Sequence, residues 1–164
     1  SGFSAGGHLA CCLGVFWDKE WLYGALDVKP DMIRPDGMIL CYPVITSGES
    51  CHRGSFECLM GADAAYKDEK LRRLLSLEYQ VGSQVPKTFL WHTWTDQSVP
   101  VENSLALLQA LRKAGVNAEA HLYPVGPHGV ALGTDETQGV NGKYLEPYCD
   151  SWMDLAVRWI REQL

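Results

Sequence analysis

A serine, an aspartate and a histidine stand in the settings that acyl-transfer chemistry requires. Ser4 lies in the segment Gly2-Phe3-Ser4-Ala5-Gly6, which matches the G-x-S-x-G pattern of a sharp strand-to-helix turn that exposes a serine hydroxyl. A serine hydroxyl is a poor nucleophile at neutral pH. It therefore needs a base to take its proton and a carboxylate to orient that base. The pattern predicts Ser4 as a nucleophile.

The candidate acid and base each follow a predicted strand. Carboxyl ends of the strands in an open parallel sheet form its active crevice. Asp96 comes directly after the apolar run 87–94, and His128 lies in a Pro-His-Gly loop after the run 117–125. We therefore predict Asp96 as the orienting acid and His128 as the base.

Other aspartates are also candidates for the orienting acid. Asp96 itself could instead be an ordinary exposed turn residue or a helix cap. Only Asp96 directly follows a predicted strand and precedes a capped helix. The competitors that lack this setting are Asp18, Asp27, Asp36, Asp63 and Asp135.

The other histidines have settings that favour structural roles. His92 and His121 fall within predicted strands, where we expect packed or edge residues. His8 lies one turn into the first helix, where packing or a hydrogen bond to a neighbouring loop is expected. His52 is expected to be a solvated loop residue, although it could reach a substrate.

The oxyanion of a tetrahedral intermediate needs two hydrogen-bond donors. The backbone N–H of Ala5, at the start of the helix that follows Ser4, is the predicted first donor, helped by the helix dipole. The second donor is expected from a loop outside this sequence. No strand precedes the turn in the sequence, so we interpret the chain as the C-terminal part of a larger domain.

The elements that must position these residues alternate between helix and strand. Apolar runs bounded by turn residues predict the strands, and 3.6-residue periodicity predicts the helices. Such alternation indicates an α/β fold, a parallel sheet with flanking helices and right-handed crossovers. The predicted strands are 37–44, 87–94 and 117–125, and the predicted helices are 5–16, 98–115, begun by Ser98 and closed by Gly115, and 150–164.

One polar, mixed segment interrupts this alternation. Residues 46–86 contain two short stretches with helical character, 55–60 and 68–75. The segment is either a cap or lid insertion or an ordinary long connection. We treat 1–164 as a single, partial catalytic domain that carries it.

Composition restricts the class of partner. The 164 residues carry a formal net charge of −6 and no basic cluster, which argues against a nucleic-acid surface. The sequence has no apolar run long enough to cross a membrane, and its first sixteen residues do not support a signal peptide. A small-molecule partner and a cytoplasmic location are expected, with secretion left open because the true N-terminus is expected to lie outside the sequence.

Six cysteines favour neither disulfides nor a metal site. Cys11 and Cys12 are adjacent, and Cys41 lies in an apolar run, so most are expected to be small core residues. Cys51, His52 and Cys58 do not match a common zinc spacing. No metal and no cofactor are expected.

Three motifs together carry a family resemblance. The segments 2–10, 95–100 and 126–129, in the chain order Ser, Asp, His, resemble the α/β-hydrolase superfamily, and within it the bacterial acetyl-esterase and xylan-esterase-like branch. Phe3 replaces the aspartate that the hormone-sensitive-lipase branch tends to carry before its serine. The resemblance covers the C-terminal part of the family's domain.

The resemblance implies a serine carboxylesterase that forms an acyl-enzyme on Ser4. It would act on short acyl esters, with acetyl groups on sugars or xylan as one candidate substrate. Four aromatic residues could line an acyl or sugar pocket, although most of them are expected to be buried in the core: Trp17, Trp21, Tyr42 and Trp94.

Two alternatives stay open at this stage. The same three residues would serve a peptidase or an acyltransferase. The chain could also be a non-catalytic hydrolase fragment that acts in binding, or that self-associates through an unpaired sheet edge.

Overall fold

Four parallel strands form the sheet that the sequence predicts. The structure is a computed structural model that describes residues 1–164, apart from the side chains of Ala64 and Tyr66. Within it, the strand order is β1-β2-β3-β4, and each neighbouring pair is parallel. The α/β prediction is therefore confirmed. The strands are β1 (Gly2–Phe3), β2 (Gly37–Cys41), β3 (Lys87–Thr93) and β4 (Ala118–Tyr123).

The first strand corrects one expectation. The sequence shows no strand before Ser4, yet Gly2 and Phe3 pair in register with Leu40 and Cys41 of β2. Two residues are too few to show a period in the sequence. Their pairing depends on the neighbouring edge of β2, which sequence patterns do not reveal.

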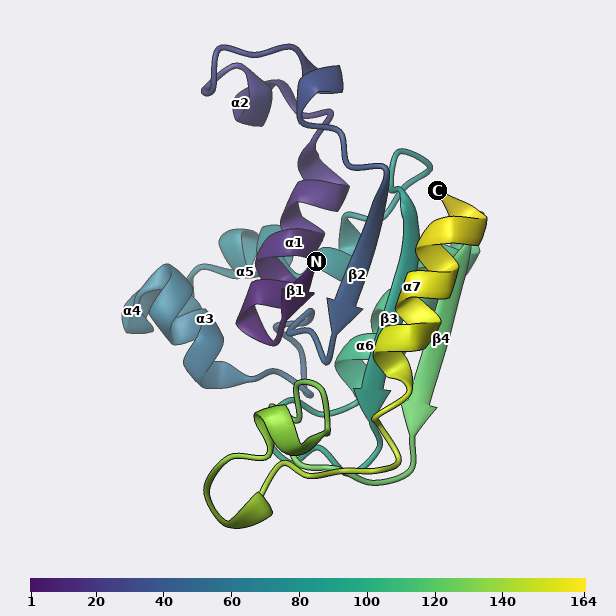
Figure 1. Cartoon of the computed structure of the whole chain (residues 1–164). Coiled ribbons are helices and arrows are strands. Elements are labelled where there is room, and N and C mark those ends of the chain that lie inside the picture. Colours follow the sequence, from purple (N-terminus) through teal and green to yellow (C-terminus); the bar gives the residue numbers. More distant parts are fainter.

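Helices cover both faces of the sheet (Figure 1). Leu40 and Leu90 face one side, where they pack with Cys11 and Val15 of α1 and Leu107 of α6. The helices on this side are α1 (Ala5–Phe16) and α6 (Glu102–Lys113).

The opposite face packs against the C-terminal helix α7 (Trp152–Gln163), drawn in yellow in Figure 1. Phe89 and Trp91 of β3 form a cluster with Trp152, Ala156 and Trp159. These three helix residues recur at four- and three-residue spacing, which places them on one side of the helix. The predicted helix 150–164 is confirmed with ends two residues and one residue shorter.

The segment 46–86 contains three short helices, which lie on the α1 side of the molecule (Figure 1). They are α3 (Arg53–Met60), α4 (Ala62–Lys67) and α5 (Glu69–Leu75), followed by a single 3₁₀ turn, Leu77–Tyr79. The two stretches with helical character in the sequence thus lie in α3 and α5. A role of the segment as a cap stays a prediction.

Several predicted ends differ from the structure by one or two residues: the strand 87–94 ends at Thr93, the strand 117–125 spans Ala118–Tyr123, and the helix 98–115 ends at Lys113. Two larger differences have a visible cause. The strand 37–44 ends at Cys41, because Tyr42 has a positive φ of 37° that extended backbone does not allow. The helix predicted from Ser98 begins at Glu102 with Val101 in the N-cap position and no side-chain cap. The backbone N–H of Ser98 donates instead to the carboxylate of Asp96.

The remaining elements are short. They are α2 (Glu20–Tyr23) and the 3₁₀ turns Pro30–Met32, Asp135–Thr137 and Val140–Gly142.

The two glycines of the Gly-x-Ser-x-Gly pattern are predicted to differ in tolerance. A Cβ at Gly2 would lie 2.1 Å from the carbonyl oxygen of Gly6, whereas a Cβ at Gly6 would meet nothing within 4 Å. Gly2→Ala should lower the free energy of unfolding by about 1–3 kcal/mol through overpacking. Gly6→Ala should be neutral or stabilising by up to about 1 kcal/mol, because Gly6 lies in a helix.

Urea unfolding of the two variants beside the unsubstituted chain measures this difference. Equal losses in the two variants would show that the close contact at Gly2 does not control the turn.

Candidate active site

Ser4 occupies a strained turn between β1 and α1. Its φ of 54° and ψ of −120° are unusual for a residue with a side chain. Three backbone hydrogen bonds hold this conformation: the N–H of Ser4 donates to Cys41 O at 2.9 Å, and its carbonyl accepts from Val44 at 3.1 Å and from His8 at 3.2 Å. The turn is thereby fixed to the end of β2, with the Ser4 side chain partly exposed.

The structure brings Ser4, His128 and Asp96 into one hydrogen-bonded line. Ser4 Oγ lies 2.7 Å from His128 Nε2, and His128 Nδ1 lies 2.6 Å from Asp96 Oδ2. The carboxylate accepts the proton of Nδ1, so Nε2 of the neutral ring is free to accept from the Ser4 hydroxyl. This is the arrangement in which a serine hydroxyl can lose its proton as it attacks.

The carboxylate of Asp96 is buried, with 5% of the residue exposed. Its Oδ1 accepts the backbone N–H groups of Ser98 and Val99, each at 2.9 Å. Burial alone would raise the pKa of Asp96, but the hydrogen bonds from His128, His92 and the Val99 N–H outweigh it and hold that pKa well below its usual range. Asp96 therefore stays ionised at neutral pH.

Threonines at the end of β3 fix the loop that carries His128. Thr93 Oγ1 donates to the carbonyl of Gly126 at 2.9 Å. The hydroxyl of Thr95 donates to the same carbonyl at 3.3 Å and accepts from the Gly126 N–H at 3.1 Å. The loop is thus tied to the strand end that also presents Asp96.

An aromatic cluster lies behind the His128 ring. The Tyr42 ring meets His128 edge-on at a centroid distance of 5.0 Å and Trp91 at 4.9 Å, and Trp91 stacks on Trp152 at 5.2 Å. Tyr42 Oη accepts from the Ala131 N–H, and Trp152 Nε1 donates to the Ala131 carbonyl. This cluster limits how far the His128 ring can move.

The expectation that most of the four aromatic residues considered for a pocket are buried in the core is wrong. Tyr42 is buried as expected, and Trp17 is partly buried. Trp21 and Trp94 are each 58% exposed. Trp94 extends beyond the last paired residue of β3, so its side chain leaves the core.

Three of the other histidines have structural partners. His8 donates from Nε2 to the carbonyl of Leu75 at 2.9 Å, and burial lowers its pKa. His52 caps α3 by accepting from the Ser55 N–H, and His121 contacts Glu119 at 2.8 Å.

The remaining histidine, His92, has a contact with Asp96 that the sequence does not predict. His92 was expected to be packed, and it is fully buried, but its Nε2 also lies 3.3 Å from Asp96 Oδ2. The spacing of four residues between the two side chains was the available signal.

Ala5 begins α1, where an N–H has no partner within the helix. Ala5 also lines an apolar pocket of about 260 Å³ beside Ser4. The other residues of this pocket are His8, Leu9, Cys12, Val44, Ser55, Phe56, Leu59 and Leu75.

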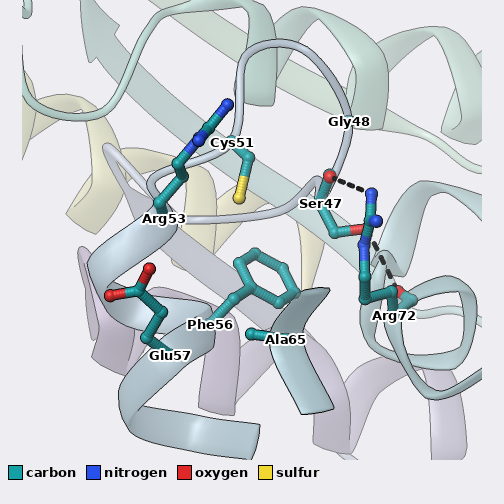
Figure 2. Close-up of a pocket in the computed structure, with 8 residues that line it drawn as sticks. All are labelled: Ser47, Gly48, Cys51, Arg53, Phe56, Glu57, Ala65 and Arg72. Carbon is teal, nitrogen blue, oxygen red and sulfur yellow. Dashed lines mark hydrogen bonds between the residues drawn. The ribbon is translucent and has the colours of Figure 1, made fainter. Parts of the chain in front are cut away.

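A second, smaller pocket of about 150 Å³ also includes Phe56 (Figure 2). Arg72 lies at its side and donates to the carbonyl of Ser47 at 3.1 Å, and Arg53 and Glu57 come from the first turns of α3. This pocket is more polar than the one beside Ser4.

The part of the chain that the structure describes contains no group of three or more side chains suited to a metal ion. None of its helices is long and apolar enough to cross a membrane. All six cysteines are free, and Cys11, Cys41 and Cys149 are buried.

The chain is similar to a family of hydrolases and to two curated hydrolases. The sequence model of the prolyl oligopeptidase family matches residues 56–144. The chain is 40% identical over 139 residues to endo-1,4-beta-xylanase B of Butyrivibrio fibrisolvens, and 34% identical over 136 residues to an acetylxylan esterase of Xylanibacter ruminicola. These matches cover 82% and 81% of this chain, but 21% and 26% of the relatives.

A solved structure is similar over nearly the whole chain. The acetyl ester-xyloside bifunctional hydrolase of Caldicellulosiruptor lactoaceticus is 39% identical with a TM-score of 0.76, covering 98% of this chain and 54% of that protein. The chain therefore spans about a quarter or less of the curated relatives and about half of this structure.

The depressed pKa of Asp96 predicts how its contribution to stability depends on pH. A carboxylate whose pKa falls on folding stabilises the fold above its unfolded pKa of about 3.9, and that contribution is lost as the pH falls through the lower folded value. Asp96→Asn should cost about 1.5–3 kcal/mol at pH 7. The difference should narrow below about pH 4.

Urea unfolding at pH 7, 5 and 3 measures this difference. Asp135→Asn, which changes an exposed aspartate, is the control and should change stability by less than about 0.5 kcal/mol. A difference for Asp96→Asn that stayed constant with pH would contradict the hydrogen-bond account.

Proposed function

Because the chain belongs to the prolyl oligopeptidase family of α/β hydrolases, we propose that it carries the nucleophile, base and acid of a serine esterase for short acyl esters. The observation that supports this most directly is the hydrogen-bonded line from Ser4 through His128 to Asp96. The names of the relatives, which refer to acetylxylan and acetyl esters, support an ester over other acyl substrates.

The proposed reaction forms and breaks an acyl-serine. Ser4 Oγ attacks the ester carbonyl while His128 Nε2 takes the hydroxyl proton, and Asp96 stabilises the resulting imidazolium. The oxyanion accepts a hydrogen bond from the Ala5 N–H. His128 then gives its proton to the departing alcohol, and water, deprotonated by the same ring, releases the acid and restores Ser4.

The pocket beside Ala5 is the proposed site of the acyl group. Its wall is mainly apolar, and its volume of about 260 Å³ suits a short chain rather than a long lipid. Ala5 belongs both to this wall and to the proposed oxyanion site. A carbonyl carbon on Ser4 Oγ would therefore direct its oxygen and its acyl group to neighbouring parts of α1.

An acylated carbohydrate is the proposed substrate on the alcohol side. Exposed aromatic rings stack on sugar faces, and Trp94 is exposed two residues before Asp96, at the same edge of the sheet. Acetyl esters of xylan sugars fit this arrangement. The xylan esters in the relatives' names lend it further support.

A peptidase is the second candidate function, because the matching family is named for oligopeptidases. The three side chains would serve an amide as they serve an ester. A panel of p-nitrophenyl esters and peptide p-nitroanilides separates the two: faster turnover of the anilides would favour the peptidase.

Loss of the Ser4 hydroxyl should abolish acyl-serine formation. The chain incubated with p-nitrophenyl acetate or a fluorophosphonate should gain one acyl or phosphonyl group on Ser4, located by peptide mass spectrometry. Removing a member of such a triad typically lowers kcat by about 10⁴- to 10⁶-fold, so Ser4→Ala and His128→Ala should be unlabelled within the time of the assay.

Ser83→Ala, which changes an exposed serine, is the control and should label normally. Equal labelling of Ser4→Ala and the unsubstituted chain would refute the proposal.

Narrowing the apolar pocket should shift the preferred acyl length. Leu59 is 56% exposed and lines the pocket, so Leu59→Trp should fill part of it at small cost to the fold. One methylene in an apolar pocket is worth about 10- to 200-fold in specificity. The ratio of kcat/KM for butyrate to that for acetate should therefore fall by about 10-fold or more.

Leu74→Trp, at an exposed position outside this pocket, is the matched control and should leave the ratio unchanged. An unchanged ratio in Leu59→Trp would place the acyl group elsewhere while leaving the role of Ser4 intact.

A further inference from the structure

His92 makes more contacts than its burial requires. It lies in β3, is fully buried, and is surrounded by three polar groups, one from α6 and two from the turn 96–99. Its Nδ1 lies 2.7 Å from Ser104 Oγ in α6, and its Nε2 lies 3.0 Å from the carbonyl of Val99. The same Nε2 lies 3.3 Å from Oδ2 of Asp96.

The acceptors around the ring determine where its proton lies. The carbonyl of Val99 can only accept, so His92 Nε2 must carry a hydrogen. In the neutral ring Nδ1 then accepts the hydroxyl proton of Ser104. The Nε2–H is thus directed at both the Val99 carbonyl and the Asp96 carboxylate, as a shared hydrogen bond.

The Asp96 carboxylate receives donors on both oxygens. Oδ1 accepts two backbone N–H groups, and Oδ2 accepts from His128 and faces His92. Without the contact from His92, Oδ2 would have His128 as its one side-chain donor. Oδ1 would stay held by the two backbone N–H groups, but Oδ2 could then follow the movement of the His128 ring.

We propose that His92 is a positioning residue for Asp96: its Nε2–H holds both Oδ2 and the Val99 carbonyl, and so fixes the direction in which the carboxylate meets His128. The proposal rests on the function proposed for Ser4, His128 and Asp96. His92 itself touches no reacting atom. Its effect on the reaction passes through Asp96.

A purely structural buried histidine would need two of these three contacts. Ser104 and Val99 together satisfy both ring nitrogens, so the approach to Asp96 is additional. The Val99 N–H in turn donates to Asp96 Oδ1. The turn 96–99 is therefore held at its carboxylate and at its carbonyl by one ring, which couples the acid to β3 and α6.

Two substitutions separate positioning from packing. In His92→Gln the side-chain amide nitrogen can reach the position of Nε2 and donate to Val99 and Asp96. In His92→Asn the shorter amide reaches only the position of Nδ1, beside Ser104. Both variants lose the ring, so a packing role predicts a lower Tm in both, somewhat more so for the smaller Asn, with no separate change in kcat or in the hydrogen bond between His128 and Asp96.

The proposal predicts that His92→Asn lowers kcat of ester hydrolysis by about 10- to 100-fold with little change in KM, because misplacing a catalytic group acts on the chemical step. His92→Gln should recover most of that loss. His121→Asn, a histidine on the adjacent strand that contacts Glu119, is the control and should keep full activity.

A spectroscopic measurement on the unliganded chain tests the same point without turnover. The proton on His128 Nδ1, held 2.6 Å from Asp96, should give a far-downfield ¹H resonance. That resonance should persist in His92→Gln and broaden or move upfield in His92→Asn. If His92→Asn fails to fold, Ser104→Ala, which frees one side of the ring, should move the resonance in the same direction by less.

The outcomes distinguish this proposal from the proposed function. An unchanged His128 resonance and unchanged kcat in a folded His92→Asn, with a lowered Tm alone, would reduce His92 to a packing residue. Equal losses of activity and Tm in the Gln and Asn variants would do the same. Failure of Ser4 to form an acyl-serine would instead refute the esterase, while the resonance would still report whether His92 positions Asp96.

Discussion

A buried carboxylate is the constraint on which the rest of the site depends. Removing an ionised carboxylate from water costs several kcal/mol unless hydrogen bonds replace its hydration. Asp96 obtains them from the backbone of residues 98 and 99, from His128 and from His92. The Asp96 carboxylate must therefore be reached by groups from the end of β3, from the segment before α6 and from the loop after β4.

The strained turn at Ser4 depends on the same edge of the sheet. A positive φ at a residue with a side chain costs about 1–3 kcal/mol, and it persists where surrounding contacts determine it. Hydrogen bonds from Ser4 to Cys41 and from Val44 to Ser4 provide those contacts at the end of β2. Ser4 and Asp96 are thus held at the carboxyl ends of neighbouring strands, β2 and β3.

Residues marked by a short motif or by their place after a strand can be predicted from the sequence. Ser4, Asp96 and His128 follow from a turn pattern and from their places after predicted strands, and the structure brings them together. Their catalytic roles stay predictions. The helix predicted from Ser98 begins later, at Glu102, because the Asp96 carboxylate binds the backbone N–H groups of Ser98 and Val99, and such a side-chain-to-backbone turn competes with helix formation.

Contacts between distant segments escaped prediction. The sequence predicts His92 as an ordinary strand residue. Its contacts with Ser104 and Val99 form only when α6 packs against β3. The pairing of β1 with β2 and the exposure of Trp94 likewise depend on where neighbouring elements end. A single sequence shows which residues can do chemistry, but not which buried polar groups will converge on them.

The two faces of the sheet give Ser4 different surroundings: a packed aromatic cluster on one and an apolar pocket on the other. On the side of α7, Tyr42, Trp91 and Trp152 pack behind His128 and keep its ring aligned with the carboxylate. On the side of α1, the apolar pocket opens beside Ala5 and Phe56. Under the proposed function, a carbonyl carbon on Ser4 Oγ would lie between the His128 ring and this pocket. Substitutions in the pocket wall should then change the preferred acyl group without moving His128, because the aromatic cluster that holds its ring packs on the opposite face of the sheet.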